Sequence, residues 1–483
     1  MRQQGPSAPW ARLCLLSALA LAACKGAVDS PDSAEANASG NAAQPASGIV
    51  LSGTVPADVV LPQNIGANDQ LKIRPNFDDF SWRTFIALNW PVDPGQRGAP
   101  KDPNSAAAFL NAGASYATVW DSYRTAEDLY VTGRPIEWNG AGSTPTPCSA
   151  AGGGVEPLIK LTKMASSLSD LNQAFSFPLV DQNGKYVRYE IYFNQVQYDA
   201  LRGTDDPTTW LYRLKQRNAA EQKNGYISLP MAASSPYAEG ATMVKAAWRE
   251  MVPADDIKRY YTRQAVIYDT SGQQPVCRNA TVGLIGLHIA RKLSDFPQWV
   301  WSSFEHIDNV PFDDGSLPPG RMSLNNGKPT PVTQDGYSQP PPGKLPVANP
   351  APVQVTRVNP IPTTPAKVPG QTWPNGAGST VDVNNAYRAA VQGSVWANYQ
   401  LVITQWPFDA VTPPTPFKPK EAGGVYPQDA GGPFPLYDAV NTALETYLQA
   451  RGPAVGAGGN SCMQCHYGAG REDFSWSLRR RPK

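Results

Sequence analysis

Hydrophobic and polar residues alternate most clearly over residues 186–194, where every second side chain is aliphatic or aromatic. A period of two predicts a strand with one buried and one polar face. Asn183 followed by Gly184, just before this run, is a strong signal for a hairpin turn. Further apolar runs predict strands at residues 241–251, 263–269, 282–290 and 400–406.

Helical patterns are fewer. We expect a helix over residues 77–89, capped by Asn76 and ended by Pro91. Apolar stripes predict a second helix from residue 297 to about 308, and residues 384–399 look partly helical. A last helix is predicted over residues 436–451, since Gly452 and Pro453 are stop signals.

The predicted fold class is therefore α+β: an antiparallel or mixed sheet with attached helices and long Pro/Gly-rich loops, ending in a helix and a loop. We expect five regions: a signal peptide (1–23), a disordered tether (24–53), an α+β body (54–319), a Pro-rich linker or surface loop (320–374) and a C-terminal region packed on the body (375–483).

The first residues combine Arg2 and Arg12 with an apolar run that ends at Ala23, a pattern typical of a secretory signal and too short for a membrane span. The run leads into Cys24 and resembles a bacterial lipobox. That resemblance implies that Cys24 is lipidated and anchors an exported protein through acyl chains. Because Lys25 follows the lipidated position, it weakly favours the outer membrane.

Near the C-terminus, Cys462, Cys465 and His466 stand in the spacing C-x-x-C-H. This spacing lets two thiols reach the two vinyl groups of one porphyrin while the next residue places an imidazole under the iron. The motif resembles that of c-type cytochromes, which implies one covalently bound haem c with His466 as proximal ligand. A zinc site that recruits Cys148, Cys277 or a distant histidine, or a redox dithiol, is the alternative.

The position of the motif is unlike that of an ordinary small cytochrome c, because no methionine or histidine follows His466. A sixth iron ligand from this chain must therefore lie upstream. His306, on the predicted helix beside Trp299, is the first candidate, and His288, on a predicted buried strand, is the second. For each of them the alternative is a hydrogen-bonded structural histidine. Met231, Met243, Met251, Met322 and an open sixth position remain further alternatives.

Cys148 and Cys277 are left once the other cysteines are assigned, and a disulfide between them is the simplest account in an exported protein. Without Arg2 and Arg12, 41 − 2 = 39 basic residues face 40 acidic ones, which argues against nucleic acid as a partner. The basic cluster at residues 479–483 suits an acidic redox partner.

Axial ligation separates the functions that this chain could serve. A six-coordinate iron is suited to electron transfer between periplasmic redox partners, and this is the leading hypothesis. A five-coordinate iron would suit a haem enzyme, peroxidase-like or an oxygenase, whose pocket the upstream body forms. A scaffold protein with haem as a local relay is a third reading. The sequence alone does not decide whether the protein is an enzyme.

Overall fold

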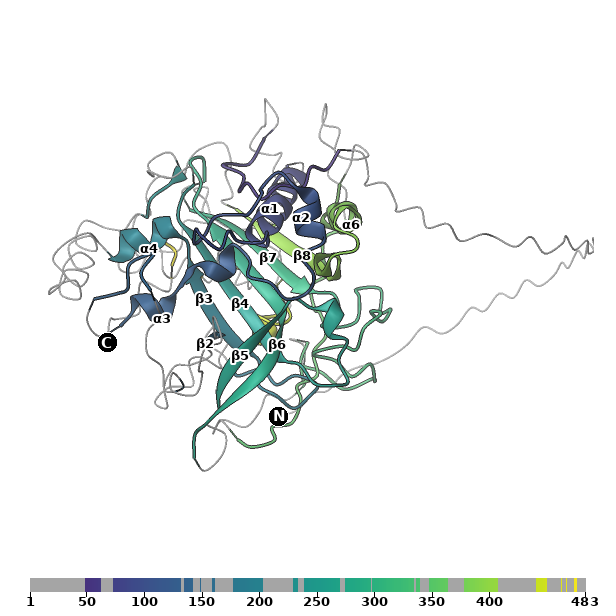
Figure 1. Cartoon of the computed structure of the whole chain (residues 1–483). Coiled ribbons are helices and arrows are strands. Elements are labelled where there is room, and N and C mark those ends of the chain that lie inside the picture. Colours follow the sequence, from purple (N-terminus) through teal and green to yellow (C-terminus); the bar gives the residue numbers. More distant parts are fainter. Residues whose placement is uncertain are drawn as a thin grey trace, which may run out of the picture. The chain divides into compact units, whose positions relative to one another are not determined.

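One sixteen-residue strand, β6, organises the sheet that fills the centre of the molecule (Figure 1). Its second half, Val282 to Arg291, pairs with β4 along one edge. Along the other edge, β5 pairs with residues 276–283 of β6, and β7 pairs with residues 286–291. β3 and β1 continue the sheet beyond β4, and β8 continues it beyond β7.

The structure is a computed structural model. It describes residues 48–61, 73–131, 134–141, 148, 159–160, 177–202, 229–232, 239–269, 274–296, 298–333, 336–338, 347–363, 378–406, 440–449, 462, 466 and 473–475. The predicted signal peptide, Cys24 and Cys465 lie outside these residues.

The elements in chain order are α1 (Arg74–Leu88), α2 (Ala106–Leu110), η2 (Trp120–Ser122), β1 (Arg124–Thr125), α3 (Ala126–Leu129), β2 (Ile159–Lys160), β3 (Arg188–Phe193), α4 (Gln195–Arg202), β4 (Thr242–Glu250), η6 (Ile257–Arg259), β5 (Thr262–Asp269), β6 (Val276–Arg291), β7 (Val300–His306), α6 (Thr380–Ala390), η7 (Val395–Asn398), β8 (Tyr399–Gln405) and η8 (Thr446–Leu448).

All strand pairs are antiparallel except the short parallel pair of β2 with β5. The predicted class, a sheet of this kind with attached helices, is confirmed. The five strands predicted from alternation and apolar runs correspond to β3, β4, β5, β6 and β8. The predicted turn is also present, since Gly184 has φ +67° and its N–H donates to the carbonyl of Asp181 at 3.0 Å.

Helices α1 and α6 pack on one face of the sheet, the helix-covered face, which includes Leu287, Ile289 and Phe304 (Figure 1). The predicted helix over residues 77–89 is α1. Its Phe85 stacks on Phe304 with ring centroids 4.2 Å apart. Trp82 meets the same ring edge-on at 5.1 Å. Such large buried rings supply most of the apolar area that holds a helix on a sheet.

The helix predicted over residues 297–308 is wrong, because residues 300–306 form strand β7 between β6 and β8. Every residue of β7 is buried, so the strand lacks the polar face that reveals alternation. Its Val300, Trp301 and Phe304 are residue types that favour strands. Trp299, with φ +73°, also has a left-handed backbone that an α-helix does not contain.

Segments without regular structure cover the opposite face, the loop-covered face, which carries His288, Trp301 and Glu305. Residues 322–325 and 353–355 of the Pro-rich region bury Leu324, Val353 and Val355 in the core on this side. Within the residues described, 440–449 form turns and the short η8 in place of an α-helix.

A side chain explains that departure from the predicted C-terminal helix. Asn441 Oδ1 accepts from the N–H groups of Ala443 and Leu444, at 2.9 and 3.1 Å. Its Nδ2 donates to the carbonyl of Phe304 at 2.7 Å. Asparagine thus offers the backbone an alternative to helical hydrogen bonds and ties the turn to β7.

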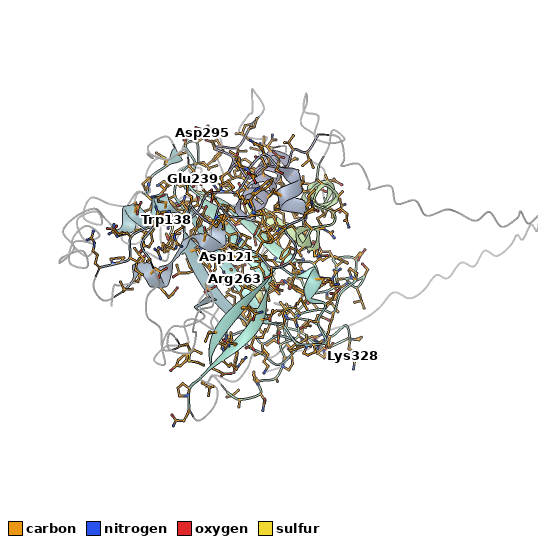
Figure 2. The ribbon with its side chains drawn as sticks, viewed as in Figure 1. Asp121, Trp138, Glu239, Arg263, Asp295 and Lys328 are labelled. Atoms are coloured by element: carbon orange, nitrogen blue, oxygen red, sulfur yellow. A yellow bond between two sulfur atoms is a disulfide. The ribbon has the colours of Figure 1, made fainter. Side chains whose placement is uncertain are left out.

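Ion pairs also lie inside the fold. Asp121 accepts from the hydroxyl of Tyr261 at 2.8 Å and pairs with Arg263 of β5, and Figure 2 shows the two labelled residues side by side. Both members of the pair are buried. Because breaking a buried ion pair is strongly destabilising, the pair holds the segment after α2 on the sheet.

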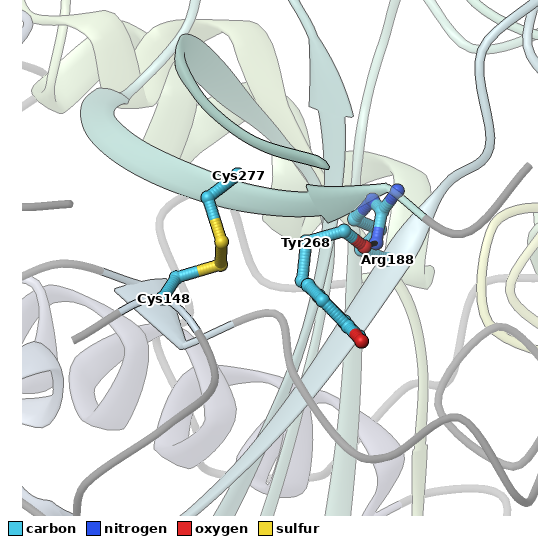
Figure 3. The surroundings of a disulfide bond; sticks show 4 residues. All are labelled: Cys148, Arg188, Tyr268 and Cys277. Carbon is cyan, nitrogen blue, oxygen red and sulfur yellow. Dashed lines mark hydrogen bonds between the residues drawn. A yellow bond between two sulfur atoms is a disulfide. The ribbon is translucent and has the colours of Figure 1, made fainter. Parts of the chain in front are cut away.

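The predicted disulfide between Cys148 and Cys277 is confirmed (Figure 3). It joins the first residues of β6, through Cys277, to a residue 129 positions earlier, with the Cα atoms 5.6 Å apart. Nearby, Arg188 of β3 donates to the carbonyl of Tyr268 of β5 at 3.4 Å. The disulfide therefore holds the end of the β5–β6 pair at which Cys277 lies.

Loss of this disulfide should destabilise the protein. In the chain-entropy account, opening a loop of this length costs about 4 to 5 kcal/mol of unfolding free energy. We expect a Cys148→Ala/Cys277→Ala variant to unfold at lower urea concentration than the oxidised wild type. Added reductant should lower the wild-type midpoint and leave that of the variant unchanged. Equal midpoints for the two oxidised proteins would contradict the expectation.

Candidate functional site

The motif residues that the structure describes lie against the sheet. Cys462 packs on the main hydrophobic core and is partly buried. The imidazole of His466 rests on the indole of Trp301, with ring centroids 4.0 Å apart and the planes inclined by 45°. Trp301 belongs to β7 and points to the loop-covered face, so this face holds the end of the motif.

A backbone carbonyl fixes the protonation pattern of His466. Its Nδ1 lies 2.6 Å from the carbonyl oxygen of Phe474. Because a carbonyl only accepts, Nδ1 carries the proton, and in the neutral ring Nε2 carries the lone pair. Burial lowers the pKa of His466 to about 4, although the hydrogen bond to Phe474 acts in the opposite direction. A neutral imidazole with a fixed Nε2 lone pair is the form that binds a metal.

His288 lies on the same face as Trp301. On β6 it pairs with Ser303 of β7 and Lys245 of β4, one row from the pair of Ala290 and Trp301. Side chains in adjacent rows on one face are within reach of each other. His288, Lys245 and Glu445 all affect the pKa of His466, the first two by lowering it and Glu445 by raising it.

The second ring nitrogen of His288 is in an unusual position. Nε2 lies 3.2 Å from Oε2 of Glu445, yet it makes no hydrogen bond within the described part of the chain. Buried polar atoms are normally paired, so each exception calls for an explanation. The structure thus places an imidazole nitrogen and a carboxylate together beside the motif histidine.

His306 occupies a different environment. Its Nε2 donates to the carbonyl of Arg259 at 2.9 Å, and its Nδ1 accepts from the N–H of Asp308 at 3.1 Å. Tyr260 stacks on the ring at a centroid distance of 3.9 Å. The residue is fully buried, and both ring nitrogens are satisfied.

The structure does not bring His306 together with His466. His306 is five residues along β7 from Trp301, about 16 Å at the rise of an extended strand, and an odd separation places it on the opposite face. Its selection as the first distal candidate depended on the predicted helix, which is absent. Of the two candidates, His288 is the one that lies on the face that holds His466.

The zinc alternative loses two of its ligands. Cys148 and Cys277 are bonded to each other, so neither thiol is available to complete a site with Cys462. Within the ranges described, no group of three or more histidine, cysteine, aspartate or glutamate side chains is arranged to hold a metal ion.

Sequence reasoning missed the groups that surround the motif histidine. Lys245, Glu445 and the adjacent pair Asp473 and Phe474 come from three separate segments, and none stands in a recognisable pattern. Among the groups near His466, Trp301 alone could be noticed in the sequence, because a large aromatic side chain usually marks a packing contact.

Comparison of the chain with family models, with curated proteins and with solved structures gives no match. Among the described helices, none combines the length and the apolar character that crossing a bilayer requires.

The pH dependence of stability tests the structural role of His306. Burial lowers its pKa to about 4. Between that value and the ordinary value of 6.5 the unfolded chain binds the extra proton, so stability falls as pH decreases. Relative to a His306→Gln variant, the wild type should lose up to about 3 kcal/mol of unfolding free energy between pH 7 and pH 4.

Urea denaturation of both proteins at several pH values measures this difference. The comparison is needed because burial raises the pKa of Asp78 and that of Asp181 to about 6, which changes stability in the opposite sense in both proteins. Parallel pH profiles would contradict the assignment of His306 as a buried neutral imidazole.

Proposed function

We propose that this chain is a monohaem c-type cytochrome that transfers single electrons. Cys462 and Cys465 would form the thioether bonds, and His466 would be the proximal iron ligand. The observation that carries the proposal is the hydrogen bond from His466 Nδ1 to the carbonyl of Phe474, in a residue that already completes a C-x-x-C-H motif. Such a bond orients a metal-binding imidazole and raises its basicity.

The donor chemistry fits this cofactor. A neutral imidazole is held in one tautomer, and the first motif cysteine lies against the hydrophobic core, where a porphyrin edge would be shielded from water. When bound, haem supplies a centre that gains and loses one electron. The chain orients its proximal ligand, packs Trp301 beside that ligand and limits the access of water.

His288 is the residue that this proposal places on the distal side, in agreement with its position on the face that holds His466. Its Nε2 has no competing hydrogen bond among the described residues, whereas both nitrogens of His306 are occupied. A second histidine ligand would close the iron to substrates and favour electron transfer.

The contact between His288 and Glu445 favours one second candidate function, a haem enzyme that is peroxidase-like or an oxygenase. At 3.2 Å, the carboxylate is placed to hold or return a proton at the imidazole. A distal histidine near the iron but not bonded to it would then act as the general acid and base.

The proposal includes export. A signal peptide over residues 1–23, lipidation of Cys24 and a tether would hold the protein in the bacterial cell envelope, facing the periplasm. The tether would end before residue 53, because Ile49 and Leu51 pack on the main hydrophobic core. The disulfide between Cys148 and Cys277 supports an oxidising compartment. Residues 375–483 would belong to the same body, and their Pro/Gly-rich loops would carry the motif to the sheet. The partner would be a periplasmic redox protein.

Absorption spectra test this function. The anchor-free protein, produced with the haem-attachment machinery, should be low-spin in both oxidation states and should not respond to carbon monoxide. His288→Gln should become high-spin and bind carbon monoxide, because it loses the sixth ligand. His306→Gln is the matched control, since it changes the only other histidine outside the motif, and its spectra should equal those of the wild type.

The outcomes separate the candidates. Wild-type protein that is high-spin, binds carbon monoxide and oxidises a dye with peroxide would favour the enzyme, provided that His288→Gln and Glu445→Gln abolish turnover. Spectra altered by His306→Gln but not by His288→Gln would contradict the arrangement that we propose.

A further inference from the structure

The carbonyl that binds His466 belongs to a turn with an uncommon backbone. Asp473 and Phe474 have φ values of +52° and +59°, which are left-handed conformations that residues other than glycine rarely adopt. A conformation of this kind persists where the surroundings hold it in place. The hydrogen bond between Phe474 and His466 therefore depends on whatever holds this turn.

The carboxylate of Asp473 holds it. Oδ2 accepts from Lys292 Nζ at 2.6 Å and from the N–H of Leu229 at 2.6 Å. Oδ1 accepts from the indole Nε1 of Trp299 at 3.3 Å. Asp473 and Lys292 are both almost fully buried, 5% and 2% exposed. Water competes little with an ion pair at this depth, so its geometry is firmly set.

The two side-chain donors come from the connection between two central strands. Lys292 directly follows β6, and Trp299 directly precedes β7. The backbone of Trp299 is also in the left-handed region, with φ +73°. Asp473 and Trp299, which contact each other, therefore both have constrained backbones. The same connection leads to Trp301, on which the His466 ring rests. The connection between β6 and β7 and the start of β7 thus position both the His466 ring and the Phe474 carbonyl.

We propose that Asp473, Lys292 and Trp299 form a clamp that positions the Phe474 carbonyl and so sets how strongly His466 donates electrons to its metal. This inference rests on the proposed function. A strong bond from Nδ1–H to a carbonyl makes the opposite nitrogen a better donor, which favours oxidised iron and lowers the reduction potential. The three residues are positioning residues, since they act through Phe474.

The competing explanation is that the clamp only stabilises the fold. Loss of one partner of a buried ion pair is destabilising wherever it occurs. The test therefore needs a readout at His466 and a control ion pair elsewhere. Asp181 supplies the control, because it is fully buried and pairs with Arg249 at 3.1 Å, in a cluster that does not include the motif.

The experiment uses the full chain without its lipid anchor, labelled with ¹⁵N-histidine and prepared without haem. The sequence has three histidines, so variants of His288 and His306 assign the ring signals. The wild type should show His466 with the proton on Nδ1. In Asp473→Asn, the ratio of the Nδ1–H to the Nε2–H form should fall about fivefold, as expected for the loss of one hydrogen bond. Asp181→Asn should leave the ratio unchanged.

A second variant guards against failure to fold. Lys292→Met/Asp473→Asn removes both charges of the buried pair together, and it should show the same change in ratio. With haem attached, both clamp variants should have a higher midpoint potential than the wild type and the Asp181→Asn control.

Three results are distinguishable. An unchanged His466 ratio and potential in clamp variants that are destabilised as much as Asp181→Asn would overturn the positioning role. A changed ratio and a raised potential would support it. A changed ratio in a chain that never acquires haem would support the clamp as the device that orients His466 and would refute the haem function.

Discussion

The pairing of β6 along both of its edges is the constraint on which the rest of the structure depends. One edge is taken by β4, and the other is shared by β5 and β7. A strand held in this way cannot shift its register by one residue without exchanging its two faces. Leu287 and Ile289 are therefore committed to the helices, and His288 to the loop-covered face. Each row across β4, β6 and β7 presents a fixed set of side chains, and two adjacent rows contain Lys245, His288 and Trp301.

On the loop-covered face, polar side chains attach the covering segments to the sheet, whereas α1 and α6 cover the other face. Asn441 satisfies two N–H groups of its own turn and one carbonyl of β7. Glu305 of β7 accepts from the N–H and hydroxyl of Thr442, at 2.9 and 2.7 Å, and pairs with Arg357. Buried backbone groups require partners, and here side chains provide them. The C-terminal segments can then lie on the sheet without forming regular structure.

The sequence revealed what depends on local periodicity. Strand β3 shows a period of two, and β4, β5, β6 and β8 are apolar runs bounded by turn residues, so all five could be predicted. Strand β7 could not, because both of its faces are buried and its spacing of aromatic residues also fits a helix. That error placed His306 near the motif. Asp473 and Lys292 are 181 residues apart, and only tertiary packing shows that they meet. The C-x-x-C-H motif is defined by its spacing alone, so it could be recognised directly from the sequence.

The most direct test of the central claim is mass spectrometry of the tryptic peptide spanning residues 452–471, which contains Cys462, Cys465 and His466. The full chain would be exported in a host with the haem-attachment machinery, alkylated under denaturing conditions and digested. Our account predicts a peptide that carries one haem, with neither thiol alkylated. A folded protein whose peptide carries two alkylated cysteines and no haem would contradict the account.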